Sequence, residues 1–274
     1  MQIKNLLIFI FSVNIFFSPA QNKKNSSADS KIYENFNEFL KYFDNKKIND
    51  KSNNTRIPVS VFECVIGNQC MVEYGKQQSK LTIQPLQLLN KNYYVTLIYK
   101  IIDATGSSKS DYHLATLTDE GILKKSKNIG TNNTVVKLKD SCKINYYNDK
   151  LLEVIKWLII KNDNKEMIRK IEYNYYTIDK NGFASFFPEY SLGRKFPVIS
   201  TKIMNSKELE LYTLEQLELM KNEIFAEYGY IFTEIKWKQY FNKQKWYNPV
   251  TNNIDDLLTD IEKINIERIE QIIN

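Results

Sequence analysis

The residue types that most often perform chemistry are few in this chain, and they do not form a known catalytic pattern. The single histidine, His113, stands at the start of a predicted strand in Asp111-Tyr112-His113-Leu114, and no Gly-x-Ser-x-Gly or His-Glu-x-x-His sequence accompanies it. Asp and Glu are plentiful, but nothing marks two of them as facing each other across a cleft, as a glycosidase requires. We therefore predict no catalytic residues and no cofactor, and we interpret His113 as an ordinary strand residue.

The three cysteines are Cys64, Cys70 and Cys142, and they lack the Cys-x-x-Cys spacing typical of metal sites and thioredoxin-like proteins. Cys64 and Cys70 flank Gly67-Asn68, which favours a hairpin turn. A two-residue turn would point their sulfurs to opposite faces of the hairpin. A disulfide from either one to Cys142, or no disulfide at all, stays open. A Cys/His dyad with His113 is the less favoured alternative.

The first twenty residues have the three parts of a secretory signal peptide. Lys4 supplies a positive start, residues 6–17 are mostly apolar, and Ser18-Pro19-Ala20 ends in small residues. The apolar run is too short for a transmembrane helix, which needs about 20 apolar residues. We expect cleavage between Ala20 and Gln21, export to the periplasm or the outside of the cell, and no transmembrane segment in the mature protein.

Charge differs between the two parts of the chain. Residues 21–204 contain 29 Lys and Arg against 19 Asp and Glu, whereas residues 205–274 contain 8 against 13. A basic body would steer anionic partners toward itself, although solvated surface charge without a specific partner is the simpler interpretation. Nucleic acid is not predicted as a partner, because the chain is expected to be exported and contains no known nucleic-acid-binding motif.

The N-terminal part reads as a helix followed by many strands. Residues 21–31 form a polar leader that we expect to be flexible, and residues 32–43 have the apolar spacing of a short amphipathic helix. Together with the strands that follow, this helix would form a β-rich domain over residues 32–187. The strands are predicted at 59–66 and 69–73 as a hairpin, then at 93–102, 112–118, 122–127, 142–147, 151–160 and 170–178, with a short one near Phe183.

The strands follow one another without intervening helices, which favours an antiparallel meander or sandwich covered by the first helix. Asp119-Glu120-Gly121 and Asp179-Lys180-Asn181-Gly182 suit tight hairpin turns. The second of these resembles the start of a calcium loop, but the remaining ligands are missing, so no metal site is predicted. The fold class is therefore α+β.

The last part of the chain is predicted to be helical. Residues 188–204 are assigned to a linker, and residues 205–274 to a small three-helix domain. Thr213-Leu214-Glu215-Gln216 and Thr259-Asp260-Ile261-Glu262 are capping boxes that open the first and third helices, and Gly229 ends the first. The second helix is expected near 233–243. One face of the first helix is lined by Leu214, Leu217, Met220, Ile224 and Tyr228. The second helix carries Ile235, Trp237, Tyr240 and Phe241, and the third is expected to turn Ile261, Ile264, Ile269 and Ile272 inward.

A series of motifs runs through residues 205–274. It contains Asn222-Glu223-Ile224-Phe225-Ala226-Glu227-Tyr228-Gly229-Tyr230-Ile231-Phe232, then Tyr240-Phe241, Gln244 and Trp246-Tyr247-x-Pro249, and finally Glu262, Asn265-Ile266 and Ile269. In this order the motifs resemble the YARHG domain, a small module of bacterial extracytoplasmic proteins. The β-rich part resembles the body of many uncharacterised exported bacterial proteins. The family motif supplies the candidate site residues, whose role is structural or binding: Asn222, Glu223, Phe225, Ala226, Glu227, Tyr228, Gly229, Tyr240, Phe241, Trp246, Tyr247 and Pro249.

The chain departs from the family motif at its centre. Glu227 and Tyr228 occupy the positions of the family's Arg-His pair, and Phe225 replaces its leading Tyr. A ligand site that needed a cation and an imidazole would therefore be lost or reversed in charge. The aromatic group around Trp246 and Tyr247 could stack on sugar rings if it were exposed, but the core of a small helical domain is the preferred interpretation.

These observations favour a non-enzymatic interaction module at the cell envelope. In this hypothesis the β-rich domain carries the specific contact, and the helical domain docks on a cell-wall polymer or on another envelope protein. The alternative is a carboxylate-dependent hydrolase acting on an envelope polymer. It predicts a concave pocket that contains an acidic side chain of raised pKa.

Overall fold

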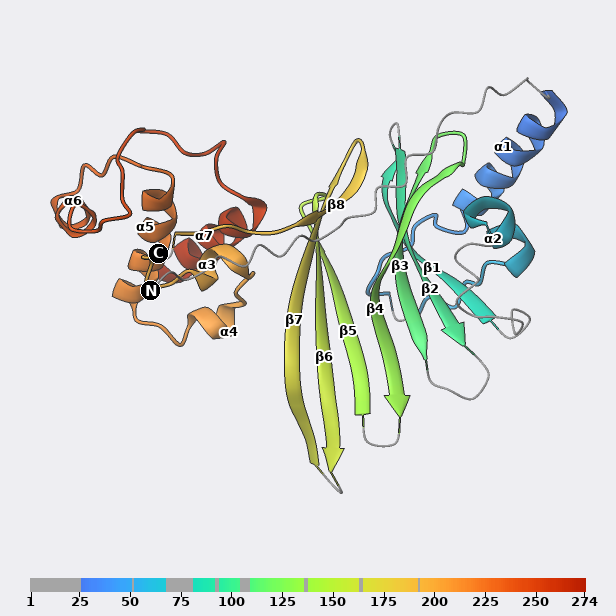
Figure 1. Cartoon of the computed structure of the whole chain (residues 1–274), viewed down its shortest axis with the longest axis horizontal. Helices are drawn as coiled ribbons and strands as arrows, with labels where there is room; N and C mark the ends of the chain where they lie inside the picture. Colours follow the sequence, from blue (N-terminus) through green and yellow to red (C-terminus); the bar gives the residue numbers. More distant parts are fainter. Residues whose placement is uncertain are drawn as a thin grey trace, which may run out of the picture.

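The computed structural model describes residues 26–50, 52–67, 81–91, 94–103, 109–135, 138–162, 165–191 and 193–274. In this part of the chain a long antiparallel sheet is followed by a group of helices, so the α+β class is confirmed (Figure 1). The expected cleavage site at Ala20 and Gln21 and the expected strand at 69–73 lie outside the described residues. Among the described helices, none has the length and apolarity needed to cross a bilayer.

Two helices cover one face of the sheet at its beginning. Helix α1 (Ser26–Lys41) and helix α2 (Val59–Ile66) pack on strands β1 to β3. Phe36, Phe39 and Phe43 are almost completely buried in this layer, as the helical spacing predicted. The helix begins at Ser26, however, inside the segment expected to be a flexible leader.

The prediction of a strand at 59–66 was wrong, because this segment is helix α2. A short apolar run satisfies both periodicities, and tertiary packing decides between them. Here Phe62, Val65 and Ile66 are buried, at the i, i+3 and i+4 spacing of a helix. The hairpin argument for the direction of the Cys64 sulfur therefore fails as well.

The predicted meander is confirmed, since the eight strands of the described sheet lie in the order of the sequence. Each strand pairs antiparallel with the next one. Strand β1 was not predicted, because Pro85 and two register shifts break its alternation. The strands are β1 (Leu81–Lys91), β2 (Tyr94–Asp103), β3 (Ser110–Thr118), β4 (Leu123–Val135), β5 (Leu138–Tyr147), β6 (Leu151–Asn162), β7 (Lys165–Asp179) and β8 (Gly182–Phe186).

The sheet curls, so that its last hairpin approaches its first strands. Strand β8 contacts β2 and β3, and β1 contacts β7. The Lys125 ammonium on β4 donates to the Phe183 carbonyl on β8. The β7–β8 turn is the predicted one, with Gly182 at φ +104°. The concave face encloses a second apolar cluster: Leu86, Ile98, Leu114, Ile129, Ile144, Leu152, Val154, Tyr176, Ile178 and Phe183.

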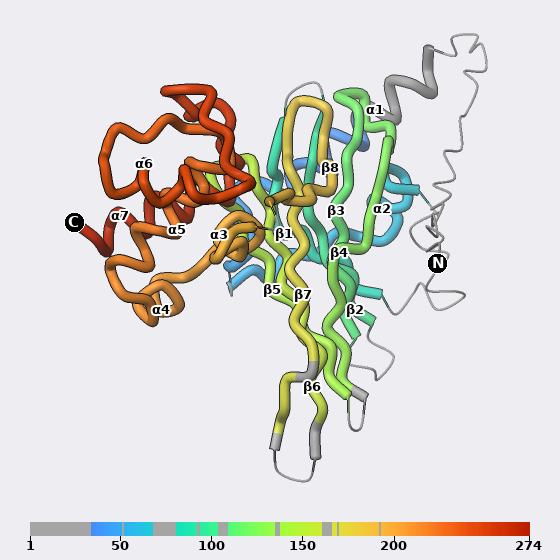
Figure 2. The backbone as a smooth tube through the Cα atoms, turned by 60° about the vertical axis from the view of Figure 1, so that its left-hand side comes forward, coloured from blue at the N-terminus to red at the C-terminus, as the bar shows by residue number. Residues whose placement is uncertain are grey.

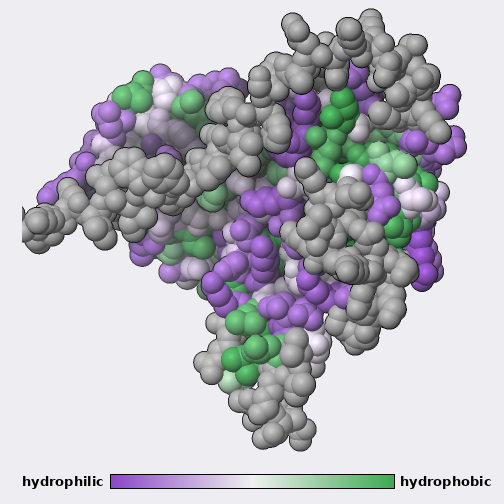
Figure 3. Space-filling view, turned by 45° about the vertical axis from the view of Figure 1, so that its right-hand side comes forward, coloured by the Kyte–Doolittle hydropathy of each residue, from purple (hydrophilic) through white to green (hydrophobic). Residues whose placement is uncertain are grey.

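Strands β6 and β7 project beyond the rest of the sheet. Strand β8 pairs with β7 only from Tyr175 onward, so the first part of β7 forms an edge. Figure 3 shows apolar side chains gathered on this projecting arm, where Met167, Ile168 and Ile171 are exposed.

The C-terminal helices are α3 (Val198–Thr201), α4 (Ser206–Leu209), α5 (Leu214–Glu227), α6 (Ile235–Phe241) and α7 (Asp260–Ile273). Both predicted capping boxes are confirmed at Thr213 and Thr259, and Gly229 ends α5 at φ +73°. Leu214, predicted to line the apolar face of the first helix, is exposed at the start of α5, whereas Leu217, Met220 and Ile224 on that face are buried.

Helices α3 and α4 were not predicted, and α3 lies in the segment assigned to the linker. Ile199 and Met204 from that segment are buried against α5 and α7. The helical packing therefore already includes residues before 205.

The helical part packs on one face of the sheet near β7, as Figures 1 and 2 show. Ile203, Ile261 and Ile264 cover Leu151 and Tyr175 in a shared apolar cluster. The Tyr175 hydroxyl accepts from the backbone N–H of Ile203 at 3.1 Å and donates to the buried Glu153 carboxylate at 3.0 Å. The contact between the sheet and the helices thus combines a buried apolar cluster with the hydrogen bonds of Tyr175.

Candidate functional site

The central motif residues lie on the second half of α5 and in the turn after it. Asn222, Glu223 and Ala226 are buried, whereas Glu227 and Tyr228 are half-buried. A side chain at position 229 would have its Cβ 2.5 Å from the Asn248 carbonyl oxygen, in a backbone conformation that favours glycine. The motif therefore positions acidic side chains toward the interior.

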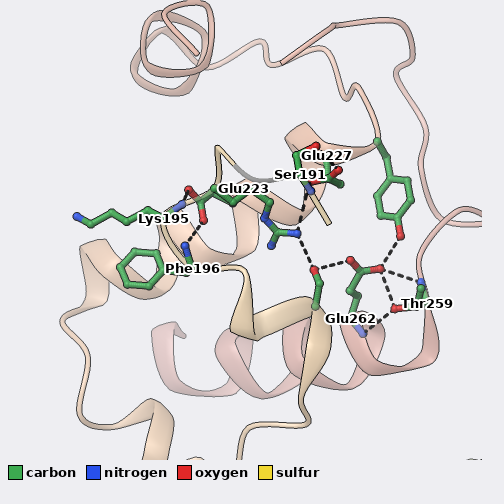
Figure 4. A network of polar contacts seen from close by, with 10 residues as sticks. Ser191, Lys195, Phe196, Glu223, Glu227, Thr259 and Glu262 are labelled. Atoms are coloured by element: carbon green, nitrogen blue, oxygen red, sulfur yellow. Dashed lines mark hydrogen bonds and ion pairs between the residues drawn. The ribbon is translucent and has the colours of Figure 1, made fainter. Parts of the chain in front are cut away.

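Two of these acidic side chains hold the segment that connects the sheet to the helices (Figure 4). The Glu223 carboxylate accepts from the backbone N–H groups of Lys195 and Phe196 at 2.7 and 2.8 Å. The Glu227 carboxylate accepts from the backbone N–H of Ser191 at 3.0 Å and from its hydroxyl at 2.6 Å. Glu223 and Glu227 thereby fasten residues 191–196 to α5.

The connecting segment supplies a buried cation to the same place. The Arg194 side chain is completely buried, and its Nη1 donates to the Ser200 hydroxyl at 2.7 Å. The same nitrogen lies 3.7 Å from a Glu227 oxygen. Burial lowers the pKa of Arg194, while the nearby carboxylates favour its charged form. A cation therefore still lies beside Glu227, although the motif itself no longer provides one.

Glu262 on α7 completes the network. Its carboxylate accepts from the hydroxyls of Ser200 at 2.6 Å and Tyr228 at 2.7 Å, and from the backbone N–H of Thr259 at 3.0 Å. Burial raises the pKa of Tyr228, and the hydrogen bond to Glu262 adds to this effect. Tyr228 thus works as a neutral donor that joins α5 to α7.

The aromatic motif residues form a core, as the preferred interpretation predicted. Phe241 is fully buried and Trp237 nearly so, while Trp246 and Tyr247 pack against them. The Tyr247 hydroxyl donates to the Tyr230 carbonyl at 2.7 Å. The motif's Pro249 is exposed.

Residues of each motif in the series make contacts in this packing: Glu223 on α5, the aromatic cluster around Phe241, and Glu262 on α7. Residues 196–274 match the YARHG domain model. The match begins at Phe196, where the helical packing begins, and it covers the C-terminal part of the chain alone. Searches of curated proteins and of solved structures find no significant match.

Outside the YARHG domain, an open groove of about 470 Å³ lies on the concave face of the sheet. Lys156 on β6 and Lys170 on β7 are its cations, and Asp140 and Glu172 are its carboxylates. The cross-strand pair Lys156 and Glu172 continues the face that Val154 begins, so the groove adjoins the enclosed apolar cluster. The full lining is Asn128, Gly130, Thr131, Asp140, Ser141, Lys156, Trp157, Leu158, Lys170 and Glu172.

Acid catalysis is the chemistry that the carboxylates of the groove could perform. A general acid needs a raised pKa, but the hydrogen bond from Lys170 lowers the pKa of Glu172. Within the described residues, no three His, Cys, Asp or Glu side chains come together as a metal site. The sequence had no signal for this groove, because its residues come from four different strands.

The cysteines do not add a nucleophile to the groove. Cys64 on α2 and Cys142 on β5 are free thiols, and Cys70 lies outside the described residues. Burial raises the pKa of Cys142 to about 12, so its thiol stays protonated at neutral pH.

His113 lies within strand β3, where its ring stacks on Tyr99 with 5.2 Å between the centroids. Burial lowers its pKa from 6.5 to about 4, against the opposing effect of Asp111. Between these values the unfolded chain binds a proton that the folded chain does not. Stability should therefore be complete above pH 6.5 and should fall by up to about 3 kcal/mol as the pH drops toward 4.

Urea unfolding at pH 7.0 and pH 4.5 measures this effect, with His113→Gln as the comparison. The difference in unfolding free energy between the two pH values should be smaller in the variant by about 2–3 kcal/mol. An equal pH dependence in both proteins would contradict the assignment to His113.

Proposed function

We propose that this protein is an exported, non-enzymatic interaction module of the bacterial cell envelope. Export is supported by the signal-peptide pattern that ends at Ala20 and by the YARHG domain, which is associated with exported proteins. The partner is a cell-wall polymer or another envelope protein. The observation that carries the proposal is the open polar groove on the concave face of the sheet.

The groove suits a polar ligand, because its lining combines two ammonium groups with two carboxylates. Its volume lies within the range of small-ligand sites, roughly 300–1,000 Å³. Lys156 offers an ammonium group, whereas the Lys170 ammonium is already paired with the Glu172 carboxylate. The Thr131 hydroxyl donates to Asp111 at 2.6 Å, so toward a ligand it can act as an acceptor.

The YARHG motif is less suited to be the main contact surface. Glu223, Glu227 and Tyr228 already make hydrogen bonds inside the protein. Using them for a ligand would release the segment that connects the sheet to the helices. A ligand in the groove on the sheet would not have to break these hydrogen bonds.

The test is co-sedimentation of residues 21–274 with purified cell-wall sacculi over a salt series. Lys156→Glu with Lys170→Glu should weaken binding by about tenfold or more, which corresponds to about 1.4 kcal/mol. The control is Lys139→Glu with Lys143→Glu, which makes the same charge change on the opposite face of β5. The control should bind like the unchanged protein.

An equal loss in both variants would mean that overall charge, rather than the groove, attracts the protein to the wall. The hydrolase alternative is followed in the same samples as release of soluble sugar or peptide from the sacculi. Release that disappears with Asp140→Asn or Glu172→Gln would replace the interaction hypothesis with the enzymatic one.

A further inference from the structure

A second groove, of about 770 Å³, lies on the YARHG domain between the start of α5 and helix α6. Its lysines come from three separate segments: Lys195 before α3, Lys236 on α6 and Lys243 after α6. All three side chains belong to exposed residues. The full lining is Lys195, Thr213, Glu215, Gln216, Leu219, Lys236, Trp237, Gln239, Tyr240 and Lys243.

The charge of this groove is opposite to that of the surrounding sequence. Residues 195–274 contain 13 acidic and 10 basic residues, yet three lysines and the single carboxylate of Glu215 line the groove. The Lys236 ammonium also forms an ion pair with the Glu218 carboxylate, 3.0 Å away. Lys195 and Lys243 remain against the one carboxylate of Glu215, so the groove is basic although the surrounding sequence is acidic.

The floor of the groove is aromatic. Trp237 is 6% exposed and packs edge-on against the half-buried Tyr240, with 6.3 Å between the ring centroids. The Lys236 ammonium lies 4.4 Å from the centroid of the Trp237 ring, so the aromatic core holds the cation at the groove. The Gln216 side-chain oxygen accepts from the Thr213 N–H, so it is already engaged in capping α5. The floor is thus fixed by the fold before any ligand arrives.

We propose that this groove binds a linear polymer that carries repeated phosphate groups. The ammonium groups of Lys195 and Lys243 can each meet one phosphate along a chain, and Lys236, which Glu218 also contacts, adds a third positive charge beside them. Lysine binds phosphate as a point charge, so a groove lined by lysines suits a chain that carries a charged phosphate in every repeat. This assigns a second binding site, distinct from the groove on the sheet, and gives the motif residue Tyr240 a place on its floor.

Isothermal titration calorimetry of residues 21–274 with inorganic polyphosphate tests the proposal at several salt concentrations. The variant Lys195→Gln, Lys236→Gln, Lys243→Gln should bind at least about tenfold more weakly. The slope of log affinity against log salt should fall by roughly two units, since each lost contact removes about 0.7–0.9. The matched control is Lys207→Gln, Lys238→Gln, Lys263→Gln, which removes the same charge from exposed positions outside the groove and should change affinity less than twofold.

Three results would overturn the proposal: equal losses in both triple variants, no binding of polyphosphate at low salt, or equal binding of the carboxylate polymer polygalacturonate. If the groove triple variant does not fold, the single change Lys243→Gln should still lower the slope by about 0.7–0.9. The variant Lys156→Glu, Lys170→Glu should bind polyphosphate normally, which separates this site from the groove on the sheet.

Discussion

Replacing Glu262 with alanine is expected to lower the free energy of unfolding by about 3–5 kcal/mol, the usual cost of removing one partner from a buried charged network. Glu262 is 1% exposed, and its carboxylate accepts hydrogen bonds from Ser200, Tyr228 and Thr259. Ser200 in turn accepts from the buried Arg194. The alanine variant would leave these donors without an acceptor and would break the capping box of α7.

Urea unfolding followed by circular dichroism measures the loss. Glu267→Ala is the matched control, because it removes an exposed carboxylate from the same helix and should cost less than about 0.5 kcal/mol. Glu262→Gln should fall between the two, since the amide keeps the volume and one acceptor oxygen. A cost for Glu262→Ala close to that of the control would show that the network does not stabilise the domain.

The sequence predicted the C-terminal helices well because their signals are local. Thr213 and Thr259 each cap a helix with the residue three positions later, and Gly229 ends α5 through its own backbone conformation. The strands from β2 onward were recognisable by alternation. Helix α2 and strand β1 were not, because the first is a short apolar run and the second contains Pro85.

The polar network could be predicted only in part. The family motif pointed to Glu223 and Glu227, but their partners lie 27 to 36 residues earlier in the sequence. Arg194 stands in a segment with Pro and Gly that resembles a linker, so nothing local marks it as buried. Contacts of this kind depend on how the connecting segment folds back on α5.

The same contacts explain the unusual centre of the motif. Where the family has an Arg-His pair, this chain has Glu227 and Tyr228, and both face partners inside the protein. Glu227 lies beside Arg194, so an arginine and a carboxylate meet here, with the cation contributed by the connecting segment and the carboxylate by the motif.

Replacing Phe241 with alanine is expected to cost about 3–5 kcal/mol, as is usual when a fully buried aromatic side chain is truncated. Phe241 is 0% exposed and touches five other rings in the aromatic cluster, with Phe232 stacked at 4.8 Å between the centroids. Its loss would leave a cavity at the meeting point of α6 and the segment that carries Trp246.

Ile235→Ala is the matched control, since Ile235 is 71% exposed on the same helix and its truncation should cost less than about 0.5 kcal/mol. Urea unfolding followed by tryptophan fluorescence reports on this cluster directly, because Trp237 and Trp246 belong to it. A Phe241→Ala protein as stable as the control would mean that the YARHG aromatics are not the core of the domain, and a binding role for them would then become the better explanation.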